Sequence, residues 1–262
     1  MTIFIEKLKF VFKKYENIFY PLISFGLFIA IWAIYSASVK IELILPSPAA
    51  TFNSFFALLG LKTFWIAVGN TLLRTTISFI ISFFLATFFA IIGAFCRPVH
   101  KLLEPIITIL RATPTMSIIL LAIIWLKSTT SPMLIAFLVV FPMCYTAIYE
   151  AIINVDGKLL EMSNVYRVKK IDIVKKFYIP SISPTLFSSA KSNISLNVKI
   201  IIAAEVLAQT RDSIGNYMQL SKIYLDTSEL LAWSITAVLL SYLLEGVVKF
   251  IKFMAVRWEN EY

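Results

Sequence analysis

Polar and charged residues recur along one apolar stretch, residues 185–207, and on a helix they share one face. At 100° per residue they fall within about 140° of one another. They are Ser188, Lys191, Ser192, Ser195, Lys199 and Glu205. A charge at the centre of a bilayer costs roughly 2.5–3.5 kcal/mol, so this face should not contact lipid. We expect it to line a water-filled path for a solute or to contact another protein.

The same face has a second interpretation, an ion-paired structural helix packed inside a bundle. Lys191 could also extend its ammonium group to the membrane surface. Direct pairing of Lys199 with Glu205 is strained, because six residues separate them by about 9 Å along the axis and about 120° around it. Asn193 and Asn197 lie on the opposite side of the helix, where they could hydrogen-bond to a neighbouring span or subunit.

Other reactive residues are sparse. His100 is the only histidine and lies beside Arg97 and Lys101, which is typical of a solvated residue at a membrane interface. Cys96 and Cys144 lie in or beside apolar stretches, where a thiol behaves as a small hydrophobe. We therefore expect no metal site, and no Gly-x-Ser-x-Gly turn indicates a hydrolase. The sequence predicts neither catalysis nor a cofactor of the chain's own.

The elements that position these residues must be membrane-spanning helices. Of the 262 residues, 59% are hydrophobic and only 15% are charged, which excludes an ordinary water-soluble fold. The net charge of +9 is spread between long apolar blocks, a pattern that argues against a nucleic-acid-binding face. About 20 apolar residues suffice to cross a bilayer as a helix, and six segments qualify. They are residues 19–38, 70–95, 105–126, 131–150, 185–207 and 230–250.

One further apolar stretch, residues 43–61, is predicted to be a surface helix instead of a span. It opens with Leu45-Pro46-Ser47-Pro48, and its prolines and scattered polar groups suit an amphipathic helix on the membrane. With six spans and both termini cytoplasmic, 15 Lys and Arg residues are inside and 5 outside. This asymmetry obeys the positive-inside rule. Residues 1–18 and 258–262 then form cytoplasmic ends of a single domain.

The longest hydrophilic connection is residues 151–184, between the fourth and fifth spans. Its apolar residues recur at helical spacing with lysines on the other side, which predicts an amphipathic helix at the cytoplasmic surface. These apolar residues are Leu160, Val165, Val168, Ile171, Val174 and Tyr178. A basic loop that holds anionic lipid head groups would have the same composition.

The spacing in this loop resembles the "EAA" loop of ABC importer permeases, whose pattern is Glu-Ala-Ala, three residues, Gly, nine residues, Ile, one residue, Leu-Pro. Glu161, Ile179 and Pro180 hold the register. Met162 and Ser163 occupy the alanine positions and Arg167 the glycine position, which a residue with a side chain fills at higher cost. The bend is therefore either made differently or absent. By this resemblance, Glu161, Met162, Ser163, Arg167, Ile179 and Pro180 would contact a partner ATPase.

Other segments resemble the nitrate, sulfonate and taurine subgroup of these permeases in the same order. The segments are Leu45-Pro46-Ser47-Pro48, Asn70-Thr71-Leu72-Leu73-Arg74, Leu110-Arg111-Ala112-Thr113-Pro114, Ala204-Glu205 and Ile214-Gly215. The resemblance covers about residues 25–258. It implies an all-α, polytopic protein with the type I ABC importer permease (MetI-like) fold and six transmembrane helices.

The resemblance also implies partners and a mechanism. We expect a homodimer in the bacterial inner membrane, docked on a cytoplasmic ATPase and supplied by a periplasmic or lipid-anchored solute-binding protein. The solute would be nitrate-, sulfonate- or taurine-like, or related to thiamine or riboflavin, and would cross by alternating access. ATP would be bound by the partner, because the Gly157-Lys158 pair does not belong to a phosphate-binding loop. Such a loop requires Ser or Thr after the lysine and Gly five residues before the second glycine, and this chain has Leu159 and Ile152 at those positions.

Two other classes remain open at this point. A stand-alone secondary transporter or small channel would need ion-coupling carboxylates at mid-membrane and a duplicated architecture. A purely structural membrane scaffold would not need a polar fifth span.

Overall fold

The computed structural model describes the backbone of residues 2–255 and the side chains of residues 19–255 except Asn164. The predicted tail 258–262 lies outside this range. Every regular element in the described residues is helical, which confirms the all-α prediction. The elements are α1 (Thr2–Val39), α2 (Pro48–Leu59), α3 (Lys62–Phe95), α4 (Arg97–Ala112), α5 (Thr115–Trp125), α6 (Ser131–Ile153), α7 (Gly157–Val165), α8 (Lys170–Ile173), the π-helical turn η1 (Val174–Tyr178), α9 (Ile179–Ala208), α10 (Ile214–Ile223) and α11 (Thr227–Ala255).

Four of the described helices are long and apolar enough to cross a membrane: α3, α6, α11 and the part of α1 from Phe19 to Val39. The pair α4 and α5 qualifies as a fifth crossing only if the two helices are counted as one broken span. Helix α9 is not in this set although it has 30 residues. Its sequence contains the polar and charged residues discussed above. Length and composition thus give four to five spans where the sequence predicts six.

The predicted span 105–126 is not one straight helix. Helices α4 and α5 meet at 98°, and the break lies at Thr113 and Pro114. Thr113 has extended backbone angles (φ −70°, ψ 128°), because a following proline ring disfavours the helical conformation. Pro114 also has no N–H to continue the helical hydrogen bonds.

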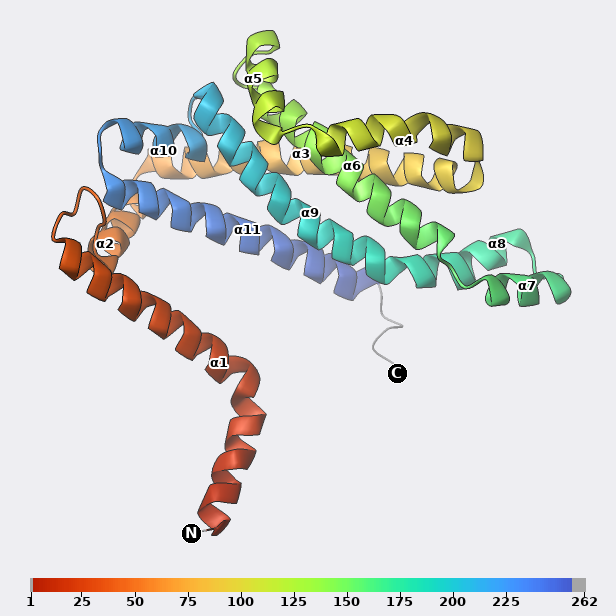
Figure 1. The fold of residues 1–262 in the computed structure, drawn as a ribbon, viewed down its shortest axis with the longest axis horizontal. Helices are drawn as coiled ribbons and strands as arrows, with labels where there is room; N and C mark the ends of the chain where they lie inside the picture. Colours follow the sequence, from red (N-terminus) through yellow and green to blue (C-terminus); the bar gives the residue numbers. More distant parts are fainter. Residues whose placement is uncertain (1, 256–262) are drawn as a thin grey trace.

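The core lies where α6 packs between α3 and α9, with α11 against the other side of α9 (Figure 1). Small residues line these contacts and let the helices approach closely, as in other membrane bundles. The fully buried small residues include Ala67, Ala86, Ala90, Ala136 and Ala204.

Helix α1 diverges from the bundle (Figure 1). Two hydrogen bonds hold its C-terminal end, from Trp32 Nε1 to the Pro46 carbonyl (3.1 Å) and from Ser36 Oγ to the Leu45 carbonyl (3.0 Å). An apolar cavity of about 910 Å³ separates α1 from α2 and α11. Helix α2 is about 18 Å long at 1.5 Å per residue, too short to cross a bilayer.

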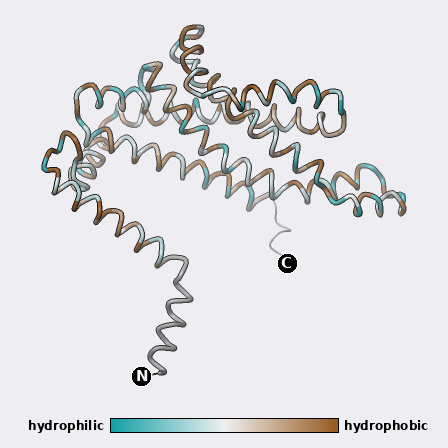
Figure 2. Tube along the Cα trace, in the orientation of Figure 1, coloured by the Kyte–Doolittle hydropathy of each residue, from teal (hydrophilic) through white to brown (hydrophobic). Residues whose placement is uncertain are grey.

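The connection 151–184 forms a hairpin rather than one amphipathic helix. Helix α7 ends at Val165, the chain turns over the next residues, and α8 then continues through η1 into α9. The hairpin projects past the end of the bundle (Figure 1), and hydrophilic and hydrophobic residues alternate along it (Figure 2).

Candidate functional site

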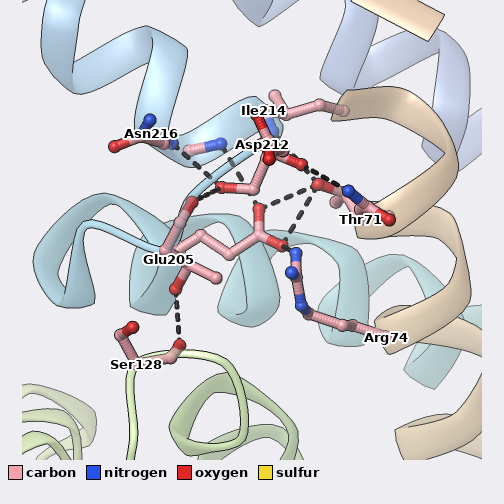
Figure 3. Close-up of polar contacts among 11 residues, drawn as sticks. Thr71, Arg74, Ser128, Glu205, Asp212, Ile214 and Asn216 are labelled. Atoms are coloured by element: carbon pink, nitrogen blue, oxygen red, sulfur yellow. Dashed lines mark hydrogen bonds and ion pairs between the residues drawn. The ribbon is translucent and has the colours of Figure 1, made fainter. Parts of the chain in front are cut away.

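Glu205 is the most densely contacted polar residue of α9, and its side chain is completely buried. Arg74 Nη1 lies 2.9 Å from Oε1, and the Thr71 hydroxyl lies 2.9 Å from Oε2. The backbone N–H of Gly215 donates to Oε2 at 3.3 Å. Figure 3 shows that these groups come from three elements, α3, α9 and the start of α10. The carboxylate therefore joins three segments that are far apart in the sequence.

The start of α10 is built around this carboxylate. Ser213 caps the helix by accepting a hydrogen bond from the Asn216 N–H at 3.1 Å, and the Ile214 N–H donates to the Thr71 hydroxyl at 3.1 Å. Free N–H groups at a helix N-terminus favour a negative charge, and Glu205 supplies it. A Cβ on Gly215 would lie 2.5 Å from Glu205 Cβ, so only glycine fits there.

This cluster changes the interpretation of Glu205. The helical wheel grouped it with the exposed polar face, whereas the structure places it against α3 and α10, paired with Arg74. The ion-paired structural role describes this residue. Three of the sequence segments that resembled the permeases, 70–74, 204–205 and 214–215, meet at this cluster. The spacing within each segment could not show that they meet.

The remaining polar residues of the predicted face stay on the outside of α9. Ser188, Lys191 and Lys199 are exposed, and Ser195 is half-buried. Lys191 Nζ lies 3.6 Å from the Glu245 carboxylate of α11, and the Ser195 hydroxyl donates to the same carboxylate. No ion pair among the described residues includes Lys199. On this face, Lys191 therefore has an acidic partner and Lys199 has none among the described residues.

On the opposite face of α9, the expected contact with a neighbouring span is confirmed for Asn197, whereas Asn193 bonds within its own helix. Asn197 is fully buried, and its Nδ2 donates to the Thr75 carbonyl at 2.8 Å and to Ser78 Oγ at 3.0 Å, both on α3. Asn193 donates to Ser189 within α9 at 3.0 Å. The two faces of α9 therefore differ: one is bonded to the bundle, and the other is open.

The hairpin positions the residues that resemble the EAA loop. Glu161 and Met162 are exposed, whereas Ser163 is buried and its hydroxyl donates to the Leu160 carbonyl at 2.7 Å. Arg167 has φ of 49°, and the Val168 N–H donates to the Ser163 carbonyl at 2.9 Å. This hydrogen bond across a left-handed residue is a Schellman motif, the usual helix ending for which glycine is preferred.

The bend that the sequence left open is therefore made, with Arg167 in the left-handed conformation. A side chain in this conformation costs roughly 1–2 kcal/mol, a cost that glycine avoids. The hydrogen bond of the motif offsets part of this cost.

Ile179 and Pro180 begin α9 directly after the π-helical turn. A proline ring collides with the carbonyl four residues earlier in a regular α-helix, and the wider turn relieves this collision. The Ile179 N–H reaches the Val174 carbonyl, five residues back. The backbone is thus helical without interruption from Lys170 to Ala208.

His100 is half-buried and has contacts that the sequence did not indicate. Its ring stacks on Tyr149 with centroids 4.0 Å apart, and its Nδ1 lies 3.0 Å from the Tyr145 hydroxyl. Both cysteines are free thiols. No group of three or more His, Cys, Asp or Glu residues in the described part of the chain is arranged to hold a metal ion.

The Glu205 cluster predicts a specific loss of stability. Glu205→Gln leaves the Arg74 guanidinium, only 13% exposed, without its counter-charge, and should destabilise the protein by about 3 kcal/mol. Thermal unfolding in detergent would measure this, with the exposed Glu42→Gln as control. Equal melting of the two variants would contradict the structural role of the pair.

The two glycines Gly215 and Gly246 give a matched test of the α9–α10 contact. Gly215→Ala should destabilise by about 1–3 kcal/mol, because its Cβ would lie 2.6 Å from the Ile202 carbonyl oxygen. Gly246→Ala, with no atom within 4 Å, should be neutral or stabilising by up to about 1 kcal/mol. The same unfolding assay checks the order, and a harmless Gly215→Ala would refute the close contact.

Comparison with known proteins places these features in a family. Residues 86–253 match the family described as binding-protein-dependent transport system inner membrane component. SsuC of Bacillus subtilis, a permease protein named for aliphatic sulfonates transport, is 22% identical over 89% of this chain and 85% of its own length. The taurine transport system permease protein TauC of Escherichia coli is 20% identical over 88% and 86%.

The fold agrees with that of a solved importer. An inward-facing structure of the MetNI methionine ABC transporter superposes with a TM-score of 0.58 at 17% identity, over 71% of this chain and 93% of the matched chain. The family model covers well over half of the sequence. The chain therefore belongs to the binding-protein-dependent inner-membrane permeases of ABC transporters, multi-pass transport components that are not themselves catalytic.

Proposed function

We propose that two copies of this chain form the membrane path of an ABC importer for a small organic anion of the sulfonate or taurine kind. The observation that carries the proposal is the open polar face of α9 with Lys199 on it. A cytoplasmic ATPase would bind ATP, and an external solute-binding protein would deliver the solute. Both termini would be cytoplasmic.

The open face supports counting α9 as a membrane span, the fifth of the six along the chain. At about 1.5 Å per residue its 30 residues extend about 45 Å, more than the roughly 30 Å of a bilayer core. Its buried side is bonded to α3, and its other side exposes Ser188, Ser192 and Lys199. Contact of such a polar face with lipid is energetically unfavourable, so water, solute or the second copy must cover it.

Charge supports an anionic solute. Glu245 neutralises Lys191, and Arg74 is engaged by Glu205, which leaves Lys199 without an acidic partner in the described residues. Arg111, just before the break between α4 and α5, is exposed, donates a hydrogen bond to the Thr146 hydroxyl at 3.4 Å and forms no ion pair with the described residues. SsuC and TauC carry names of compounds with a sulfonate group. A guanidinium and an ammonium group are suitable donors to such an anion.

The stand-alone alternative is less well supported. A secondary transporter needs carboxylates that can release and bind ions in turn. Glu205 is buried in its ion pair, and Glu245 is held by Lys191 and Ser195. Neither carboxylate is free to serve as a carrier, whereas an importer driven by an ATPase has no need of one. We therefore favour alternating access driven from the cytoplasmic side.

The path assignment predicts the behaviour of Lys199 variants in uptake of labelled taurine or an alkanesulfonate. Lys199→Ala should lower uptake at limiting substrate about 10-fold or more, because a hydrogen bond to a charged group contributes about 1.5–3 kcal/mol. Lys199→Arg should retain part of the activity. Lys222→Ala, an exposed lysine on α10, is the matched control. Normal uptake with Lys199→Leu would remove Lys199 from the path.

The orientation can be tested by labelling single cysteines from outside with an impermeant thiol reagent. In a background with Cys96 and Cys144 replaced by alanine, Lys62→Cys and Lys222→Cys should react in intact cells. Lys169→Cys, on the hairpin, should react only after the membrane is opened. External labelling of Lys169→Cys would reverse the topology and with it the assignment of the hairpin to the ATPase side.

A further inference from the structure

Arg167 occupies a backbone position at which its side chain is a disadvantage. It is the left-handed residue of the Schellman motif that ends α7, and glycine would adopt φ of 49° with less strain. The turn itself is complete without the guanidinium group, since the Val168 N–H and the Ser163 carbonyl make its hydrogen bond. The backbone therefore gives no reason for an arginine here.

The side chains around the turn are left open to a partner. Val165 is 79% exposed and Tyr166 75%, among the most exposed large hydrophobic residues described. Arg167 is exposed beside them, and neither ion pair of the described residues includes it. One turn thus presents two apolar side chains and a free cation together.

The charge of the hairpin sets the chemistry of the partner. Six basic and three acidic residues lie in residues 156–176. The basic ones are Lys158, Arg167, Lys169, Lys170, Lys175 and Lys176, and the acidic ones are Asp156, Glu161 and Asp172. The charge-complementary surface is acidic, and a planar guanidinium pairs best with a carboxylate through two parallel hydrogen bonds.

The direction of the hairpin favours a protein over lipid head groups. A lipid-bound amphipathic helix lies along the membrane with its apolar face toward the bilayer. Here α7 and α8 project past the end of the bundle, and the turn that carries Val165, Tyr166 and Arg167 joins them (Figure 1). A projecting turn presents its side chains to a body beyond the membrane surface.

We propose that Arg167 pairs with a carboxylate of the partner ATPase, beside an apolar hollow that receives Val165 and Tyr166. This inference rests on the proposed function, because it requires an ATPase at the hairpin. It adds a residue-level requirement on that partner: an Asp or Glu that faces Arg167. An arginine at this turn has a higher conformational free energy than glycine would have, and the charge contact offsets that cost.

The test measures binding of the full-length permease, in neutral-lipid nanodiscs, to the ATPase chain of the same importer. Arg167→Gly keeps the turn and removes the charge, so affinity should fall about 10-fold while thermal stability stays equal or rises. Arg167→Glu should bind still more weakly, and Arg167→Lys should retain part of the affinity. Lys222→Glu, a charge reversal at an exposed position on α10 and outside the hairpin, should have little effect.

A charge-reversal scan then identifies the other side of the contact. One Asp→Lys or Glu→Lys substitution on the ATPase should restore binding to Arg167→Glu and weaken binding to the native permease. Undiminished binding by Arg167→Gly overturns the inference. So does a loss that occurs in anionic-lipid nanodiscs but not in neutral ones, since it would assign Arg167 to head groups.

Glu161→Ala separates this inference from the proposed function. If Glu161→Ala uncouples ATP hydrolysis from uptake while all Arg167 variants bind and transport normally, the importer function stands and the Arg167 contact is refuted. If Glu161→Ala and Arg167→Glu are both without effect on binding and coupled transport, the hairpin is not the ATPase contact and the Arg167 pair is refuted, while the importer function stands. The proposed function itself fails if the native permease and its ATPase show no ATP-dependent uptake.

Discussion

The buried charge of Glu205 is the constraint on which the arrangement of the helices depends. A carboxylate in a protein interior is tolerated only when a counter-charge and hydrogen-bond donors surround it. Arg74 and Thr71 on α3 and the Gly215 N–H at the start of α10 meet this requirement. The rotation of α9 about its own axis is fixed as a result. Asn197 must then face α3, and Lys199 must face away from it.

Much of the fold could be predicted from hydropathy, because a membrane permits few structures for a long apolar segment. The helical class and the contact of Asn197 with a neighbouring span followed from composition and from 100° periodicity. The partner of Glu205 did not, since a helical wheel gives the direction of a side chain but not what it meets. The same limit applies to His100, whose stacking on Tyr149 depends on two helices. The break before α5 had a local signal in Pro114, which a search for apolar length alone passes over.

The hairpin shows a different limit of sequence reasoning. The spacing of Leu160, Val165, Ile171 and Val174 fits one continuous helix, yet the chain turns back at Arg167. The turn is specified by hydrogen bonds across five residues rather than by the identity of the residue in the left-handed position. A glycine there would have indicated the turn, and its replacement removed the signal while the geometry remained.

The unbroken helix from Lys170 through Glu205 also has a mechanical meaning. If the Glu205 cluster acts as a fulcrum, the 35 residues between them form a lever arm of about 52 Å at 1.5 Å per residue. A tilt of one degree then displaces the hairpin end by about 0.9 Å, since displacement is arm length times angle. The compliance of this lever is set at η1 and at Pro184, where the helical hydrogen bonds are widened or lost. Stiffening either point lengthens the stroke that a given tilt delivers.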